Sequence, residues 1–188
     1  MRKLVLFMHV SVDGYVAGPT GQMDFVKADN EMFEYAGQQT DQSDIALYGR
    51  VTYEMMDDYW PNAGEQPDAS KHDKQHSAWY NAVEKVVASR TLAGTSKPGT
   101  RFIGEGIGDE IRKIKNLPGK NIVMFGSPGL AKTMLREGLV DELWLFVNPV
   151  IRGEGKPLFE PGIPQTKLVL QKSEVFPSKV IMLHYNKE

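Results

Sequence analysis

Three short segments combine glycine, hydroxyl and guanidinium groups in a way that suits an anion: Gly49-Arg50-Val51-Thr52, Ser89-Arg90 and Gly126-Ser127-Pro128-Gly129. Each follows an apolar run that predicts a buried strand. Guanidinium groups pair with phosphates, and a glycine lets a phosphate approach backbone amides closely. A single segment of this kind is better explained as a turn with a solvated arginine. Three of them at strand ends predict one phosphate-binding edge, because open α/β sheets bind ligands where their strands end.

Two residues with polar, potentially reactive side chains lie at the end of the first apolar run, Leu4 to Val12. Ser11 and Asp13 end this run, and Gly14 follows. One interpretation is that the Asp13 carboxylate has a functional role. The pair Asp13-Gly14 is equally typical of a plain turn. Both interpretations of Asp13 stay open from the residues alone.

Other polar and aromatic residues are weaker candidates. Asp24 could make a polar contact to a substrate, and Trp60 could form an aromatic wall for a flat ring, although core packing explains Trp60 equally well. His72 and His76 have the i, i+4 spacing of two metal ligands on a helix, but the surrounding KHDKQH offers no third ligand. A solvated helix face explains these histidines better, and no metal site is expected.

Strands and helices alternate along most of the chain. Apolar runs between turn residues predict strands at 4–12, 45–48, 85–89, 101–103, 121–125 and 143–150. Helical spacing predicts helices at 30–39, from residue 50 onwards, at 72–84, 108–116 and 128–137, with a loop at 60–70. In the helix at 128–137, Ser127 is the expected N-cap and Pro128 the first helical residue. Residues 167–175 and 179–185 predict a C-terminal antiparallel hairpin. The order predicts an α/β fold with a mainly parallel sheet and helices on both faces.

Composition narrows the class of protein. The 188 residues suit a single domain spanning 1–188, and the formal net charge of −2 gives no general attraction to nucleic acid or anionic membranes. The chain has no cysteine, which excludes disulfides, thiolate metal sites and a cysteine nucleophile. The apolar run LVLFMHV is too short for a signal peptide or a membrane span. A cytoplasmic protein with a local anion site is therefore expected.

The ordered motifs resemble a known family. DGYVAG, LYGRVTYE, VVASRT, NIVMFGSPGLAKTML and GLVDELWLFVNPVIRGEGKPLF, in this order, are similar to the dihydrofolate-reductase-like group that includes the reductase domain of riboflavin biosynthesis. The resemblance covers nearly the whole chain. It implies an NADPH-dependent reductase that passes a hydride to a small heterocycle of pterin, pyrimidine or flavin-precursor type, and a homodimer.

The resemblance also implies roles for the residues of the three segments. The expected cofactor-binding residues are Gly49, Arg50, Thr52, Ser89, Arg90, Gly126, Ser127, Gly129 and Leu130. Gly49, Arg50 and Thr52 would hold the adenosine-side phosphates. Ser89 and Arg90 would hold the ribose 2′-phosphate. The pyrophosphate and nicotinamide would lie against Gly126, Ser127, Gly129 and Leu130. Ser11 and Asp13 match the family segment beside the nicotinamide, which implies that Asp13 orients the substrate or assists the delivery of a proton. Dihydrofolate reductase itself has two adjacent glycines where this chain has Gly126-Ser127, so the turn there is expected to differ.

Further features of the sequence bear on other functions. Dihydrofolate reductase carries its catalytic carboxylate on its first helix, but Asp29 and Glu31 have no matching motif here, which argues against folate. The stretch GSPGLAKT nearly spells the phosphate-binding loop of nucleotide kinases, but Ala131 replaces a required glycine and the early helix start leaves Lys132 in the second turn. A nucleotide-binding module without catalysis is the other alternative.

Overall fold

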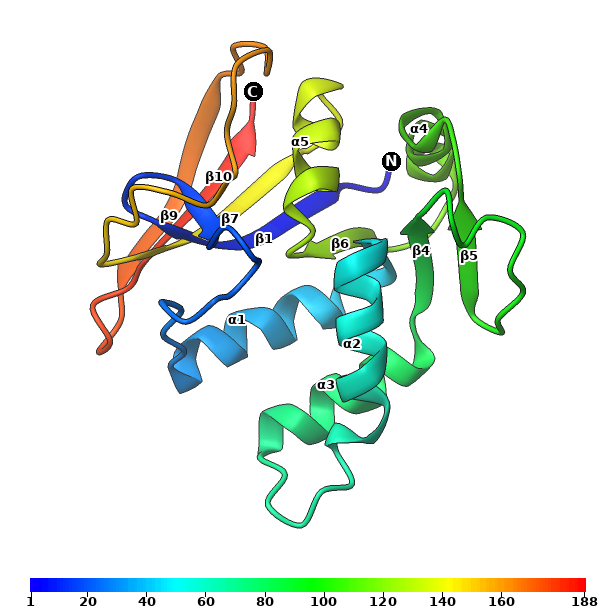
Figure 1. Cartoon of the computed structure of the whole chain (residues 1–188), viewed down its shortest axis with the longest axis horizontal. Helices are drawn as coiled ribbons and strands as arrows, with labels where there is room; N and C mark the ends of the chain where they lie inside the picture. Colours follow the sequence, from blue (N-terminus) through cyan, green and yellow to red (C-terminus); the bar gives the residue numbers. More distant parts are fainter. The chain divides into compact units, whose positions relative to one another are not determined.

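The structure, a computed structural model, describes all 188 residues, and the chain forms two compact units (Figure 1). The first unit contains Met1–Arg2 and Asn30–Val123, and the second contains Lys3–Asp29 and Met124–Glu188. No helix is both long and apolar enough to cross a bilayer. The two units are described in turn.

The strands of the first unit are parallel. β3 (Ser43–Gly49) pairs with β4 (Glu84–Ala88) on one side and with β6 (Asn121–Phe125) on the other, and β5 (Thr100–Ile103) pairs with β4. Ala46, Leu47, Val86 and Val87 are fully buried. Short apolar runs of this kind fit strands that are covered on both faces. The predicted buried parallel strands are therefore confirmed.

Four helices belong to the first unit: α1 (Asn30–Asp41), α2 (Arg50–Ala63), α3 (Lys71–Ala82) and α4 (Ile107–Asn116). α2 and α3 lie side by side (Figure 1). Ser70 and Asp73 form a reciprocal capping box that fixes the start of α3. The predicted loop at 60–70 was wrong in its first part, because α2 continues through Pro61 to Ala63. Pro61 lacks an N–H donor, but it lies in the last turn, where the helix loses little by it.

The second unit is built around one parallel pair of strands. β1 (Leu4–Ser11) pairs in parallel with β7 (Glu142–Asn148), and β10 (Ile181–Lys187) adds to the other side of β7 in antiparallel fashion. β9 (Leu168–Val175) pairs with β10, which confirms the predicted C-terminal hairpin. A short ribbon that the sequence did not predict joins β2 (Tyr15–Ala17) to β8 (Lys156–Pro157). α5 (Pro128–Arg136) matches the predicted helix.

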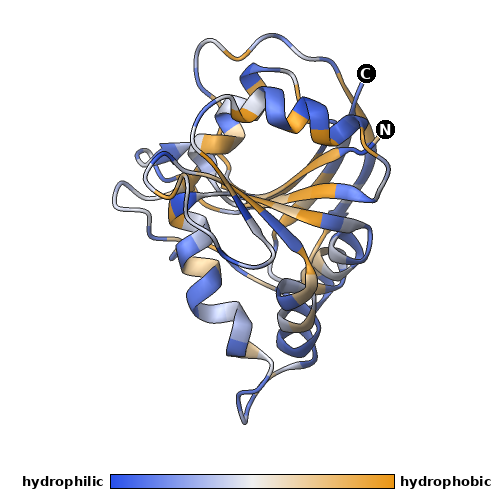
Figure 2. Cartoon of the chain, turned by 90° about the vertical axis from the view of Figure 1, so that its right-hand side faces the viewer, coloured by the Kyte–Doolittle hydropathy of each residue, from blue (hydrophilic) through white to orange (hydrophobic).

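Apolar residues are concentrated on the strands, and the outer sides of the helices are hydrophilic (Figure 2). In the second unit Leu4, Leu6, Phe146 and Met182 are fully buried. β7 offers little surface to a partner, because Leu143, Trp144 and Phe146 are buried. The chain thus has the predicted α/β fold, with mainly parallel strands and an antiparallel C-terminal hairpin.

Candidate functional site

The ends of β3 and β4 bring two of the predicted anion-binding segments together in the first unit. The register pairs Gly49 with Ala88, so Gly49-Arg50 and Ser89-Arg90 leave the sheet as neighbours. α2 begins at Arg50 directly after Gly49, and its first backbone amides have no side-chain cap. An uncapped helix N-terminus beside two guanidinium groups is a favourable place for a phosphate.

The side chains at this edge differ in whether they already form hydrogen bonds or ion pairs within the protein. Arg90 is exposed and makes no hydrogen bond or ion pair, whereas Arg50 pairs with Glu54 at 2.8 Å in an exposed i, i+4 contact. The Thr52 hydroxyl makes no hydrogen bond. Ser89 is buried, and its hydroxyl accepts a hydrogen bond from the Leu92 amide at 3.1 Å. Ser89 therefore shapes the turn that presents Arg90.

Gly104, which sequence reasoning missed, lies at the same edge of the first unit. It follows Ile103, which pairs with Ala88 at the end of β5. A Cβ at Gly104 would come within 3.0 Å of the Ala93 Cβ, so the turn after Ser89-Arg90 leaves no room for a side chain there. A glycine after a third parallel strand was the available signal, because the same rule singled out Gly49.

The third predicted segment lies in the second unit, at the start of α5. Gly126 and Ser127 both have left-handed backbone conformations, with φ of 68° and 59°. The serine was expected to cap the helix, but its side chain makes no capping hydrogen bond, because the left-handed conformation differs from that of a normal N-cap. Gly129 is exposed, with no atom near the place of a Cβ, and Leu130 is 8 % exposed and packs in the core. A non-glycine residue held left-handed is a strained feature of the kind that clusters at ligand sites.

Asp13 lies at the carboxyl end of β1 in the second unit. Its carboxylate accepts hydrogen bonds from the Ser11 hydroxyl at 2.6 Å, from the Arg152 amide at 3.1 Å and from the Gly153 amide at 2.8 Å. These donors, led by Ser11, lower the pKa of Asp13 from 3.8 to about 2. Asp13 is therefore ionised at neutral pH, which suits orientation of a neighbour and leaves no proton to donate.

Arg152 connects two of the predicted residues in the second unit, Asp13 and Asp24. Asp13 holds its backbone, and its Nη1 donates to the Asp24 carboxylate at 2.9 Å. The guanidinium also lies over the Phe25 ring, 5.0 Å from its centroid. Sequence reasoning missed Arg152, although it follows a strand end as Arg50 and Arg90 do. The strand was predicted to run to residue 150, whereas β7 ends at Asn148 and Arg152 lies in the loop that follows.

Asn148, at the end of β7, was also missed. It is fully buried, its Oδ1 accepts a hydrogen bond from the Lys27 amide at 2.9 Å, and its Nδ2 donates to the Phe146 carbonyl at 3.0 Å. Asn148 thus ties the segment that carries Asp24 to the end of β7. Ser11 is the register partner of Asn148, so the Ser11–Asp13 hydrogen bond and the Asn148–Lys27 hydrogen bond start from neighbouring strand ends.

Trp60 lies in an aromatic cluster between α2 and α3. Its ring centroid is 4.0 Å from that of His76 and 5.6 Å from that of His72. The expected solvated histidine face was wrong for His76, which is 7 % exposed, because the large ring of Trp60 covers it. Burial lowers the pKa of His76 from 6.5 to about 3. No group of three potential metal ligands occurs in the chain. Packing therefore accounts for Trp60 and His76.

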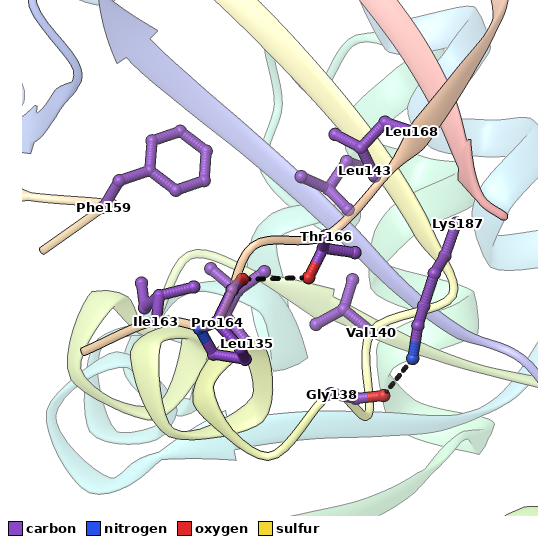
Figure 3. A pocket seen from close by; sticks show the side chains of 10 residues that line it. All are labelled: Leu135, Gly138, Val140, Leu143, Phe159, Ile163, Pro164, Thr166, Leu168 and Lys187. Carbon is purple, nitrogen blue, oxygen red and sulfur yellow. Dashed lines mark hydrogen bonds between the residues drawn. The ribbon is translucent and has the colours of Figure 1, made fainter. Parts of the chain in front are cut away.

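A pocket of about 180 Å³ lies elsewhere in the second unit (Figure 3). Its walls are mainly apolar, and they include Leu143 at the start of β7 together with Phe159 and Leu168. The Lys187 ammonium lies at its edge and donates to the Gly138 carbonyl at 2.7 Å (Figure 3). None of the predicted site residues lines this pocket, and Asn148 is at the other end of β7.

The start of α5 also bears on the kinase alternative. The helix begins at Pro128, and the Lys132 ammonium is bonded to Glu160 at 2.7 Å. A kinase phosphate loop needs its lysine directed at the phosphates from the end of a long loop. Lys132 instead pairs with a carboxylate from inside the helix.

Parallel strands that end in glycine and cationic turns, with a C-terminal antiparallel hairpin, define a dihydrofolate-reductase-like α/β protein. Residues 2–182 match the family described as the RibD C-terminal domain, and the chain belongs to this family. It is 33% identical to YyaP of Bacillus subtilis (strain 168), over 98% of this chain and 95% of that protein.

Two solved structures share the fold. A putative riboflavin biosynthesis protein from Shewanella sp. PV-4 is similar with a TM-score of 0.69 and 21% identity, over 99% of both chains. Dihydrofolate reductase from Enterococcus faecalis is similar with a TM-score of 0.65 and 14% identity, over 99% of this chain and 96% of that one. The dihydrofolate-reductase-like fold expected from the motifs is thereby confirmed.

Proposed function

We propose that the protein is an NADPH-dependent reductase that transfers a hydride to a small heterocycle of pterin, pyrimidine or flavin-precursor type. The observation that carries this proposal is the pairing of Gly49 with Ala88, which makes the two arginine-bearing turns neighbours. Membership of the RibD C-terminal domain family supports it. The Enterococcus faecalis dihydrofolate reductase was solved with NADP(H), which supports a nicotinamide cofactor.

The residues of the first unit suit the phosphate-bearing end of NADPH. Arg90 has no protein partner, and the exposed Arg50–Glu54 pair is of a kind that contributes little stability, so both guanidinium groups are available to anions. The backbone amides at the start of α2 favour a negative charge. In this proposal Gly49, Arg50 and Thr52 hold the adenosine-side phosphates, while Arg90 binds the 2′-phosphate from the turn shaped by Ser89.

The second unit carries the proposed pyrophosphate turn and the substrate side. Gly126, Ser127 and Gly129 offer backbone to the pyrophosphate, and Leu130 supports them from the core. The bound nicotinamide would supply the hydride. Asp13, held ionised by Ser11 and two amides, would orient the substrate or a water that delivers the proton.

A titration with NADPH and NADH, followed by protein fluorescence, tests this proposal. NADPH should bind in the micromolar range or tighter, and NADH more weakly. Arg90→Gln should lower NADPH affinity by about tenfold and leave NADH affinity unchanged, since it removes a charge-assisted contact to the 2′-phosphate alone. Arg112→Gln, which removes an exposed arginine of α4, is the matched control.

The outcomes of this titration separate the alternatives. Equal affinity for the two cofactors in the wild type would remove the 2′-phosphate assignment. Tight NADPH binding without oxidation across a panel of pterins, pyrimidines and flavin precursors would favour the non-catalytic module. Binding of ATP with Mg²⁺ in place of NADPH would revive the kinase alternative.

We also propose a homodimer, which the C-terminal hairpin supports. Val175 pairs with Ile181, and Leu170 with Tyr185, across β9 and β10. A register shift at residues 184–185 puts Leu168 and Leu170 on the same face as Val175, although simple alternation would put them on opposite faces. Leu170, Val175 and Ile181 are 52, 67 and 40 % exposed. An exposed sheet face that carries several large apolar side chains is typical of an interface.

A further inference from the structure

The apolar pocket of the second unit has room for one small ring (Figure 3). Its volume is about 180 Å³, and its walls include Leu135 of α5, Val140, Leu143 of β7 and Leu168 of β9. An enclosed apolar cavity of about 150 Å³ is sufficient to bind benzene. No acidic residue lines the pocket. Size and lining therefore suit an apolar ring better than a polar or cationic ligand.

The outer wall of the pocket is held in place without filling it. Residues 159–166, which connect β8 to β9, supply Phe159 and Ile163 to the lining. Glu160 ties this segment to α5, because its carboxylate pairs with Lys132 at 2.7 Å and with Arg136 at 2.6 Å. The pocket is thus formed before any ligand arrives, so that binding requires little rearrangement of the chain.

A single cation lines the pocket, and it lies at the edge. Lys187 is the register partner of Leu168, and its amide donates to the Asp141 carbonyl at 2.8 Å, so its backbone is fixed. Its ammonium carries three N–H donors. One of them is bonded to the Gly138 carbonyl at 2.7 Å, and no carboxylate pairs with the group. The ammonium can therefore donate to an anionic group of a ligand at this edge.

We propose that this pocket is a second small-molecule site, which binds a single apolar ring that carries a carboxylate. The ring lies against Leu143, Leu168 and Phe159, and the carboxylate accepts from Lys187. The pocket is at the start of β7, whereas Asp13 follows the carboxyl end of β1, which is paired with the other end of β7. Its ligand is therefore distinct from the hydride acceptor of the proposed function.

Methyl NMR with benzoate as the probe tests this site. The methyl groups of Leu143 and Leu168 report on the pocket, and those of Val12 report on the neighbourhood of Asp13. Benzoate should shift the Leu143 and Leu168 signals and leave Val12 unchanged, with a Kd of about 1 mM or lower. Benzamide has the same ring without the charge. It should bind about three- to fivefold more weakly, because an exposed ion pair contributes little more than this.

Two lysine substitutions separate the role of the charge from that of the apolar walls. Lys187→Met keeps an unbranched apolar side chain and removes the ammonium, so benzoate and benzamide should bind it equally. Lys167→Met is the matched control, because Lys167 is an exposed neighbour that pairs with Glu188 at 3.5 Å and does not line the pocket. It should keep the preference for benzoate. Lys187→Gln repeats the test if Lys187→Met does not fold.

Three results would overturn the proposal. The first is a lack of response of Leu143 and Leu168 to benzoate, or a shift of Val12 in their place. The second is equal binding of benzoate and benzamide by the wild type. The third is a response that disappears as the protein concentration is raised, because a second copy of the chain would then fill the pocket. None of these readouts involves NADPH, so failure of the proposed function would leave the result of this test unchanged.

Discussion

The buried histidine of the aromatic cluster predicts how the protein responds to acid. His76 packs against Trp60, and burial lowers its pKa from 6.5 to about 3, with the nearby His72 contributing and Asp73 opposing. His76 is therefore neutral in the folded protein at pH values where the unfolded chain takes up a proton. Its contribution to stability is complete above pH 6.5 and is lost as the pH falls towards 3.

The size of the effect follows from proton linkage. One proton taken up only by the unfolded state costs about 1.4 kcal/mol of unfolding free energy per pH unit. Between pH 6.5 and about 4.5, His76 should therefore cost on the order of 3 kcal/mol. His9 in the second unit, with a pKa lowered by burial to about 4, should add a similar loss. Together they approach the whole stability of a typical domain, about 5–15 kcal/mol.

Urea unfolding of the cofactor-free protein, at fixed protein concentration and at several pH values from 7.5 to about 4.5, measures this slope. Asp13 stays ionised throughout this window, because its hydrogen bonds lower its pKa to about 2. His76→Phe keeps a ring against Trp60 and removes the titration, so its slope should fall by about 1.4 kcal/mol per pH unit. His9→Phe should produce the same change independently. A His76→Phe slope equal to that of the wild type would refute the reasoning.

Four further substitutions test the second unit. Ser127→Gly should raise unfolding free energy by roughly 1 kcal/mol in urea unfolding, because glycine adopts the left-handed conformation without strain; a loss of stability would mean that the serine side chain outweighs the strain. Leu170→Lys and Val175→Lys should weaken a dimer by more than about tenfold in light scattering while NADPH affinity stays unchanged; an unaltered dimer would place the interface elsewhere, and a wild-type monomer would remove the dimer proposal. Asp13→Asn should cut kcat/KM by roughly ten- to a thousandfold with little change in NADPH affinity. Activity and stability near those of the wild type would make Asp13 a turn residue only, and a matched loss of NADPH affinity would place β1 on the cofactor side.

The strands and the general fold could be predicted because their signals are local. β3, β4 and β6 are short apolar runs between turn residues, and the motif order carried the resemblance to the family. The end of α2 could not be predicted, since Pro61 is an ordinary stop signal and only the packing of Ala63 shows why the helix continues. The burial of His76 was missed for a similar reason. KHDKQH is polar as a sequence, and only the neighbouring helix reveals its covering by Trp60.

Some residues of the candidate site could likewise be predicted from the sequence, and others could not. Gly49, Ser89 and Gly126 were found because each follows a strand, which is a rule about position in the chain. Arg152 obeys that rule too, but its importance depends on contacts from far away in the sequence, where Asp13 holds its backbone and Asp24 its guanidinium. The sequence suggested that the Asp13 carboxylate orients a substrate or assists protonation. In the folded chain this carboxylate holds the backbone of Arg152. Contacts between loops that are distant in the sequence, such as those of Asp13 and Asp24 with Arg152, cannot be found by motif reasoning.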